Sequence, residues 1–424
     1  MASIRIALLS DLHFFVKEDS STPHSHLPLN GNGTLADHSA GLNKNPWDDL
    51  LDLIEREGLE CDLVLCPGDI TTRANKTALV TGWGMLLNLG GKLQASLVCA
   101  ATGNHDVSSR SHAKEVAQNV IRNLGNASGP VESLKELIPL YPVAQRDPLT
   151  GVWTGERAVQ TRYFGESFVL VDDPDQRFRL LILNSCSEHG HDPHEFEKGT
   201  APISALKWIK DDLTGLTDDR VNLLMVHHPL YSSTTHDNQG YDFVFRGDNL
   251  MSILENLGDW VVMHGHKHLG EIRTASSASN GSSVIVSAAS FAAVMDANGP
   301  EGSENQFYVL DIEKTATGDV EGTIRAWSWN VGNRWQRSPP GNGDRIFFDC
   351  GFGSRMREQD IAKDISDAYD NGHSDWKDIT AMIPALKHIL PKTLGRVLAK
   401  LGQNHGLLVE TEDGWHKTVV RKAP

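Results

Sequence analysis

The sequence predicts an α/β fold built on a largely parallel β-sheet, and two features of the chain support this prediction. Over residues 4–101, short apolar runs alternate with helical segments in the order β-α-β-α-β. Such an order favours parallel strands joined by right-handed crossovers. Several apolar runs also end in Asp, Asn or His, along the first two thirds of the chain. In open α/β folds, functional side chains gather at the carboxyl ends of strands, so we expect a site along that edge.

The N-terminal elements are predicted from their apolar runs and from the residues that bound them. Ile4–Leu9 is a buried strand, and the polar stretch 17–45 that follows is long for a loop in a compact fold. Because this stretch leaves from His13, we expect it to lie over the site. Pro46 suits the first turn of a helix whose leucines form an apolar stripe. A strand at 62–66, a helix at 74–89 and a strand at 96–101 complete the first unit.

The middle of the chain is richer in strands, and its one clear helix is predicted at 202–213. Strands bounded by Gly, Pro or Asp are predicted from apolar runs. We expect the segments from 271 onward to form a second sheet packed on the first. The predicted strands are 168–171, 179–184, 221–226, 260–263, 271–274, 284–287, 307–310 and 323–329.

Composition excludes several classes of protein. At 424 residues the chain is long enough for roughly two or three domains, and its net charge of -16 argues against wrapping nucleic acid with the whole surface. The five cysteines are an odd number without paired spacing, which favours reduced, buried thiols in a cytoplasm. The first strand begins near residue 4 without an apolar leader, and no stretch is long enough to span a bilayer. We therefore expect a cytoplasmic protein without a membrane partner.

Five separated segments carry residue types that bind metal ions. Carboxylate and amide oxygens mixed with imidazole nitrogens suit hard-to-borderline divalent cations. A single Asp after a strand usually caps a helix, but the repeated occurrence of Asp with His makes a metal site the favoured interpretation. The segments are Asp11-Leu12-His13, Gly68-Asp69, Gly103-Asn104-His105-Asp106, His227-His228-Pro229 and Gly265-His266-Lys267-His268.

These segments and their order resemble the calcineurin-like metallophosphoesterase superfamily, whose pattern is D-x-H, G-D, G-N-H-D/E, H and G-H-x-H. The resemblance covers residues 4–330 and leaves no motif empty. It implies a four-layer α/β/β/α sandwich and a centre of two divalent metal ions. Mn, Fe, Zn and Ni all suit this ligand set, so the sequence does not choose among them.

The resemblance also implies a role for each ligand. Asp69 would bridge the two cations, because a carboxylate has two oxygens and a negative charge. Two cations about 3.5–4 Å apart lower the pKa of bound water towards about 7, and in the superfamily the bridging hydroxide attacks the phosphorus in line. Asp11, His13 and His268 would complete one cation site, and Asn104, His227 and His266 the other.

His105 and Asp106 are the predicted catalytic residues outside the ligand set. The superfamily uses this histidine as a general acid or as a hydrogen-bond donor to the transition state. Asp106 would orient His105 and keep it protonated near neutral pH. The alternative role of Asp106 is to cap a helix that follows Val107.

The function predicted is therefore that of a dinuclear metal-dependent phosphodiesterase for a nucleotide-type substrate. Gly68-Asp69-Ile70-Thr71 and the segment 199–209 resemble the cyclic-nucleotide phosphodiesterase branch of the superfamily. One alternative is a nuclease that uses the C-terminal part to hold DNA or RNA. Another is a non-enzymatic metal-binding scaffold, because some superfamily members have lost ligands.

The C-terminal part is predicted to be a separate unit. We divide the chain into a metallophosphoesterase domain at 1–332, a linker at 333–349 rich in Pro, Gly, Asn and Arg, and a small α+β domain at 350–424. Helices at 357–369, 375–383 and 393–401, followed by strands at 407–410 and 417–420 around Glu412-Asp413-Gly414, resemble a winged-helix domain.

One face of the last predicted helix is basic. Lys392, Arg396 and Lys400 repeat every four residues and so share one side of the helix. Such a face before a wing suggests nucleic-acid contact. The alternatives are a solvated face on a packing domain, or docking to an acidic protein partner or a second copy of the chain. The oligomeric state is not determined by the sequence.

Overall fold

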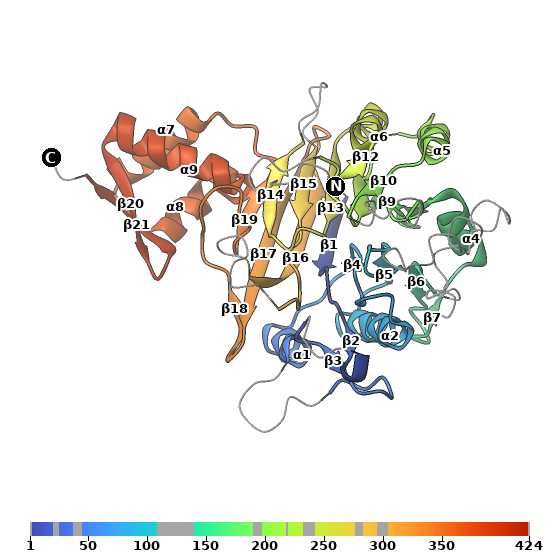
Figure 1. The fold of residues 1–424 in the computed structure, drawn as a ribbon. Helices are drawn as coiled ribbons and strands as arrows, with labels where there is room; N and C mark the ends of the chain where they lie inside the picture. The colour runs from blue at the N-terminus through green and yellow to red at the C-terminus, as the bar shows by residue number, and fades with distance from the viewer. Residues whose placement is uncertain are drawn as a thin grey trace.

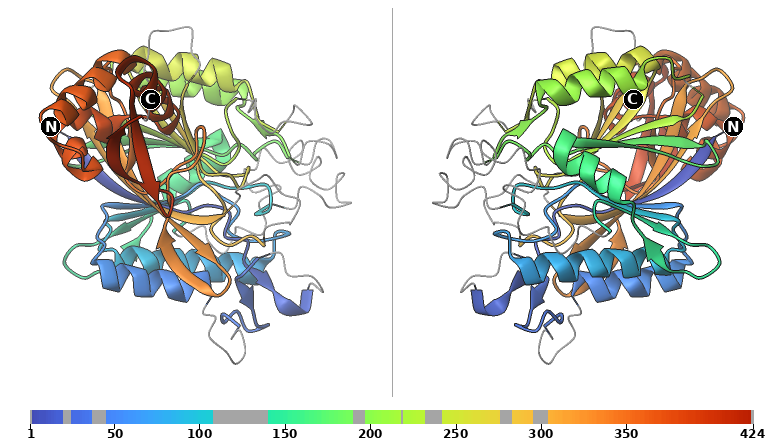
Figure 2. Two further views of the ribbon diagram at one scale, coloured as in Figure 1. Left: turned by 90° about the vertical axis from the view of Figure 1, so that its left-hand side faces the viewer. Right: turned by 90° about the vertical axis from the view of Figure 1, so that its right-hand side faces the viewer.

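The computed structural model describes residues 2–19, 25–36, 45–107, 140–189, 197–217, 219–231, 242–275, 283–294 and 304–422. Two β-sheets lie face to face, and helices cover their outer faces (Figures 1 and 2). Figure 2 shows a helical layer on each side of the paired sheets. The chain therefore has the α/β class that the alternation of strands and helices predicts.

The first sheet is built on the predicted N-terminal unit. β1 (Ser3–Leu8), β4 (Leu63–Cys66) and β5 (Leu97–Ala100) run parallel to one another. They are connected through α1 (Pro46–Glu57) and α2 (Lys76–Lys92). In the described residues this sheet has nine strands, which also include β6 (Val143–Arg146), β7 (Trp153–Thr154), β16 (Asn305–Lys314), β17 (Val320–Asn330), β18 (Asn333–Arg337) and β19 (Cys350–Phe352).

The second sheet has a parallel centre of its own. Its described strands lie in the order β14-β15-β13-β11-β9-β8, and β9, β11, β13 and β15 are parallel. α5 (Ile203–Leu213) and α6 (Gly247–Leu254) pack on its outer face. The strands are β8 (Phe168–Asp172), β9 (Phe178–Leu183), β11 (Val221–Val226), β13 (Trp260–His264), β14 (Glu271–Thr274) and β15 (Val284–Ser287).

Side chains of the second sheet alternate between two apolar cores. Along β9, Leu180 and Ile182 belong to the core between the sheets, whereas Leu181 and Leu183 pack with α5 and α6. This alternation follows from the two-residue period of a strand. Because both faces are buried, the strand reads as a continuous apolar run, which is why its sequence predicts it well.

The expectation that the strands after residue 271 all belong to the second sheet is wrong. β14 and β15 do, but β16 is antiparallel to β1 and β17 is antiparallel to β16, so both extend the first sheet. The open edge of β1 has unpaired backbone groups that require a partner. The apolar pattern of a doubly buried strand is the same in either sheet, so it does not reveal which edge the strand joins.

The long polar stretch after His13 is described only in part. β2 (Phe15–Val16) and β3 (Pro28–Leu29) pair in parallel, with the short helix η1 (Lys17–Asp19) after β2. Ser25 pairs with Ala293, which lies beside the predicted site. The expectation that the whole of 17–45 covers the site falls partly outside the described residues.

A strand lies at each end of the predicted linker. Asn333–Arg337 forms β18, antiparallel to β17, and β19, which we assigned to the C-terminal unit, also pairs with β17. Only Trp335 of β18 is buried, and its indole N–H donates to the Pro46 carbonyl at 2.8 Å. A strand with one inward apolar residue has no hydrophobic period to detect, so its polar composition resembles that of a loop.

The C-terminal unit contains the predicted helices and hairpin. α7 (Glu358–Asp370), α8 (Trp376–Met382) and α9 (Pro391–Lys400) precede β20 (Leu407–Glu412) and β21 (Trp415–Arg421), which pair antiparallel. Their buried side chains continue the core of the first sheet. The unit lies beside β19 in Figure 1. Among the described residues, no helix is long and apolar enough to cross a membrane.

Candidate metal centre

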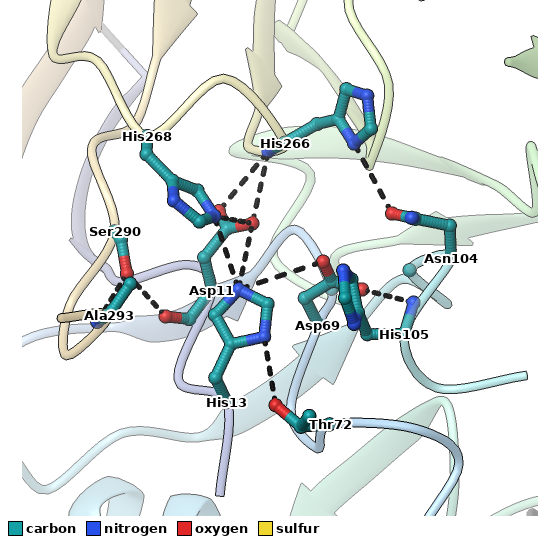
Figure 3. Close-up of polar contacts among 12 residues, drawn as sticks. Asp11, His13, Asp69, Thr72, Asn104, His105, His266, His268, Ser290 and Ala293 are labelled. Carbon is teal, nitrogen blue, oxygen red and sulfur yellow. Dashed lines mark hydrogen bonds and ion pairs between the residues drawn. The ribbon is translucent and has the colours of Figure 1, made fainter. Parts of the chain in front are cut away.

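All seven predicted ligands lie together where the two sheets meet. Those from the first sheet follow β1, β4 and β5, and those from the second follow β11 and β13. The five chain segments thus reach one point from parallel strands whose carboxyl ends face the same edge. The predicted ligands are Asp11, His13, Asp69, Asn104, His227, His266 and His268, and Figure 3 shows all of them except His227 converging.

One group of donors is formed by Asp11, His13 and His268. The Nε2 atoms of His13 and His268 lie 3.1 Å apart, and His268 Nε2 lies 3.3 Å from Asp11 Oδ1. Asp11 is fully buried, whereas His268 is half-buried at the rim. Two imidazole nitrogens and a carboxylate oxygen that face one another at this spacing form a donor set that fits one divalent cation.

A second group is formed around Asn104. Its Oδ1 lies 3.0 Å from His227 Nε2 and 3.2 Å from His266 Nδ1. The dashed line between Asn104 and His266 in Figure 3 marks the second contact. Asn104 contributes a neutral oxygen, so this half of the centre carries less negative charge than the half with Asp11.

The carboxylate of Asp69 lies between the two groups. Its Oδ2 is 3.3 Å from His227 Nε2 and 3.9 Å from His13 Nε2, and its side chain is almost wholly buried. Asp69 therefore faces one histidine of each group, which is the geometry that a bridging carboxylate needs.

Backbone conformation brings these side chains inward. Asp11, His13, Asp69, His266 and His268 all have positive φ, between 52° and 70°. Residues other than Gly rarely adopt this region, and such strain is concentrated at functional sites. Close packing adds to it, since a Cβ on Gly103 would lie 2.1 Å from Asp69 Oδ1 and one on Gly265 2.4 Å from Asp11 Oδ2. The glycines of both motifs are thus required by the carboxylates beside them.

The protonation states of the donors fit metal binding. Burial alone would raise the pKa of Asp11, but a hydrogen bond from His268 and the charges of His268 and His227 lower it to about 2. Burial also opposes ionisation of Asp69, and the charges of His227 and His105 outweigh it and hold its pKa well below the ordinary value. Burial lowers the pKa of His13 to about 3. Ionised carboxylates and neutral imidazoles are the forms that bind a cation.

His227 and His268 are the exceptions, because nearby carboxylates raise the pKa of each against the effect of burial. Burial would lower the pKa of His227, but the charge of Asp69 and a hydrogen bond to it raise the value to about 9. Its Nδ1 lies 3.0 Å from the Pro67 carbonyl oxygen and donates to it, which directs Nε2 at Asp69 and Asn104. A cation at this position would displace the Nε2 proton and take over its contacts.

Two residues outside the motifs hold the ligands in place. Thr72 Oγ1 lies 3.3 Å from His13 Nδ1, and Ser290 Oγ donates to the Asp11 carbonyl at 2.6 Å while accepting from Ala293 N at 2.8 Å (Figure 3). Sequence reasoning missed both, since a hydroxyl distant in sequence carries no metal-ligand pattern. The apolar strand before Ser290 was the one available signal, because other site residues also follow such strands.

We expect Thr72→Val to weaken metal binding about tenfold, because partners of this kind fix the tautomer and orientation of a ligating histidine. The measurement is a competition titration of the purified chain with a chromogenic chelator. Thr81→Val, which removes a similar hydroxyl bonded to the Gly33 carbonyl, is the control and should leave the affinity unchanged. Equal affinities for the Thr72 variant and the wild type would show that this contact does not position His13.

Asp106 connects the two loops that carry Asp69 and Asn104. Its Oδ1 accepts from Thr71 N and its Oδ2 from Gly103 N, each at 2.9 Å. Burial first, and then the charge of Asp69, raise its pKa to about 7, although the two backbone N–H groups oppose the shift. The segment after Val107, where the helix-cap alternative was placed, lies outside the described residues. The role of Asp106 as partner of His105 stays a prediction.

We expect Asp106→Ala to lower the free energy of unfolding by about 3 kcal/mol, because two buried N–H groups lose their acceptor. Metal affinity should fall as well, since both ligand loops loosen. Urea unfolding and chelator titration measure the two effects. If Asp106 acted on His105 alone, the variant would lose rate while keeping both its stability and its metal affinity.

His105 lies at the open side of the centre. Its backbone N–H donates to Asp69 Oδ1 at 2.8 Å, and its half-buried ring stands edge-on to that of His13 with centroids 4.9 Å apart. The ring is therefore held beside the ligands and reaches solvent.

A family model and several solved structures are similar to this chain. The family model of the calcineurin-like phosphoesterases matches residues 4–270. Among solved structures, the calcineurin-like phosphoesterase YfkN from Bacillus subtilis is 12% identical, with a TM-score of 0.31, over 76% of this chain and 90% of that one.

Two further solved structures also show similarity to this chain. The phosphopantetheinyl hydrolase PptH from Mycobacterium tuberculosis is 12% identical, with a TM-score of 0.31, over 68% of this chain and 90% of its own. A cold-active protein-tyrosine phosphatase of a Shewanella species is 14% identical, with a TM-score of 0.23, over 75% of this chain and 77% of its own. A comparison with curated protein sequences found no match. Because the family model covers well over half of the chain, the protein belongs to the calcineurin-like phosphoesterase family.

Proposed function

We propose that the chain is a phosphodiesterase that uses two divalent cations to hydrolyse a small nucleotide-type phosphodiester. The observation that carries the proposal is the position of Asp69 between two buried donor groups, within reach of a histidine of each. In the proposed assignment, Asp11, His13 and His268 hold one cation, Asn104, His227 and His266 hold the other, and Asp69 is shared. When bound, paired cations lower the pKa of water and neutralise charge on the phosphoryl group.

The chain's own residues would orient the substrate and move protons. His105 is held by Asp69 through its backbone, so its ring can donate a proton or a hydrogen bond to the leaving oxygen at the open side. The buried Asp106 carboxylate accepts hydrogen bonds from both loops and so keeps the loop of Asp69 next to the loop of Asn104. These roles are part of the proposal.

The cavity beside the centre supports a small anionic substrate. It has a volume of about 290 Å³, and its lining includes His266, Lys267 and Arg273. Asp242 and Glu271 also line the cavity, and Lys267 pairs with Asp242, so the support for a phosphate ester comes from Arg273 and from the adjacent donor groups. The volume lies near the lower limit of ordinary small-molecule sites and matches a mononucleotide better than a polymer duplex.

A substrate panel on metal-loaded protein tests this proposal. We expect cyclic nucleotides and a chromogenic diester to be hydrolysed faster than the matching monoester, single-stranded polymers or duplexes. Loading should be compared for Mn, Fe, Zn and Ni. A chain that binds two cations under replete conditions but hydrolyses none of these esters would support the scaffold alternative instead.

A nuclease is the second candidate, and a cleft at the C-terminal unit favours it. The cleft has a volume of about 1300 Å³ and lies between β18 and the unit, with Trp376, Trp415, His416, Lys377 and Lys417 in its lining. Aromatic rings beside cations are typical of surfaces that bind single-stranded nucleic acid. The predicted basic helix face does not support the nuclease, because its three cations already pair with carboxylates. Lys392 pairs with Asp344, while Arg396 and Lys400 pair with Glu358.

If the nuclease is correct, Trp376→Ala should weaken binding of single-stranded nucleic acid about fivefold or more, because stacking on one base contributes about 1–3 kcal/mol. Fluorescence anisotropy with labelled oligonucleotides measures it. Trp208→Ala is the matched control, since Trp208 is a partly exposed tryptophan on α5. We expect the small-substrate enzyme, so unchanged binding in the Trp376 variant is the predicted result and removes the main support for a polymer substrate.

A further inference from the structure

A second cluster of metal-type ligands lies beside the predicted centre and is not used by it. Cys186, His189 and His228 each offer one donor atom, and these atoms lie within 4.8 Å of one another. All three side chains are buried, with exposures of 1%, 1% and 0%. Cys186 and His189 lie in the turn after β9, and His228 follows β11, the neighbouring parallel strand. The cluster therefore spans two adjacent strand ends.

Two imidazole nitrogens of the cluster have no hydrogen-bond partner. His189 Nε2 donates to the Lys198 carbonyl at 2.7 Å, which leaves Nδ1 with its lone pair, and this buried atom is unpartnered. His228 Nδ1 is 2.8 Å from Ser185 Oγ, and its buried Nε2 is likewise unpartnered. Leaving a buried polar atom unpaired costs about 1–3 kcal/mol, so two in one cluster require an explanation.

The His228 ring is also held in place by the backbone. A Cβ on Gly199 would lie 2.8 Å from His228 Cβ and 3.0 Å from its Nδ1, so the strand β10 (Gly199–Thr200) passes directly against the ring. On the other side, the ring centroids of His227 and His266 lie 4.9 Å and 4.5 Å away. The ring is confined on both sides, as expected for a donor held in a fixed position rather than one that reorients to find water.

We propose that Cys186, His189 and His228 form a third cation site, which takes a thiophilic divalent ion of the Zn²⁺ type. A thiolate with two imidazoles is a donor set that zinc prefers, with bonds of about 2.0–2.3 Å, and three protein ligands leave one position open. The Cys186 thiol, which now donates to the Thr102 carbonyl at 3.3 Å, loses its proton to solvent as the sulfur binds the ion. Binding thus forms one bond to sulfur and two to nitrogen and releases one proton.

Such an ion would connect the loops after β9 and β11 next to the Asn104 half of the predicted dinuclear centre. This ion would have a thiolate ligand, whereas none of the seven ligands proposed for the pair of cations contains sulfur. This difference supplies a readout that does not depend on activity, on substrate or on the proposed function.

The test is Co²⁺ substitution of the full-length chain, followed by near-ultraviolet and visible absorption spectroscopy and metal analysis. We expect three Co²⁺ per wild-type chain and a thiolate-to-cobalt charge-transfer band. Cys186→Ala and His189→Gln should each bind two Co²⁺, and the Cys186 variant should lose the band. Asp69→Ala should lose the pair but keep the band with one Co²⁺, so a failure of the dinuclear proposal is distinguishable.

Cys350→Ala is the matched control, because it removes another buried thiol, on β19, and should keep the band. The wild-type spectrum decides the matter even if a variant fails to fold. Saturation at two Co²⁺ per wild-type chain without a charge-transfer band would overturn the third site. A band that persists in Cys186→Ala would also overturn it, since the thiolate would then come from another cysteine.

Discussion

Replacing Asp69 with alanine should abolish both the binding of the cation pair and phosphodiester hydrolysis. The carboxylate lies between the two donor groups, with its Oδ2 3.3 Å from His227 Nε2 and 3.9 Å from His13 Nε2. Without its charge, two cations in one buried site would repel each other unscreened. Loss of about 4 kcal/mol of transition-state stabilisation lowers kcat/KM about 10³-fold, and we expect at least that. Metal content per chain and the rate on a chromogenic diester measure the two effects.

A thermodynamic readout separates loss of metal from loss of fold. A cation at 100 times its Kd stabilises the folded chain by about 2.7 kcal/mol, so the wild type should melt at a higher temperature with metal than with chelator. Measured with Mn²⁺, which suits carboxylate ligands and not a thiolate site, Asp69→Ala should show one Tm under both conditions. Asp62→Ala is the control, because Asp62 precedes the same strand and pairs with Arg177 instead. The bridging role is untenable if Asp69→Ala still binds two cations and retains its rate.

The convergence of the seven candidate ligands is the feature of the molecule that the sequence predicts best. Each ligand segment follows a strand that is buried on both faces, so an apolar run ends directly at a polar ligand, as Val221–Val226 does at His227. The end of an apolar run and the type of the residue that follows it thus predict the same ligand positions. The backbone conformation that directs these ligands inward could not be predicted, since it includes positive φ at non-glycine residues such as Asp11 and Asp69.

Elements whose structure depends on one distant contact were not predictable. Four of the five residues of β18 are exposed, so the strand has no local apolar pattern. Its one buried residue, Trp335, donates its indole N–H to the Pro46 carbonyl, 289 residues away. The hairpin of β16 and β17 joins β1 across the whole chain. A local pattern indicates whether a residue is buried but does not identify its partner, so the pairing of β18 and β19 with β17 could not be predicted.

Residues that hold the ligands were missed for a related reason. Ser290 bonds the Asp11 carbonyl from 279 positions away, and Thr72 reaches His13 from the neighbouring strand end. Serine and threonine are common in loops, so neither differs in sequence from a solvated residue. Cys186 and His228 gain a candidate role only when β9 and β11 are seen to be neighbours.

Replacing His105 with alanine should leave both cations bound and lower kcat about 10²–10⁴-fold for substrates with a basic leaving group, the usual contribution of a general acid. The side chain stands beside His13 at the open side, and the backbone N–H donates to Asp69, so alanine keeps that hydrogen bond. For a nitrophenyl ester, whose leaving group needs little protonation, the loss should be much smaller. The dependence of log kcat on leaving-group pKa, measured for a series of esters, should therefore become steeper in the variant.

Metal analysis must accompany this measurement, because a loss of cations would mimic a loss of proton transfer. His373→Ala provides the control, since His373 is an exposed histidine in the turn after α7 and should change neither the slope nor the metal content. An equal loss of rate for all leaving groups, with two cations still bound, would rule out proton donation by His105. It would leave this side chain the role of binding the phosphoryl oxygens, which an increase in KM for every ester would reveal.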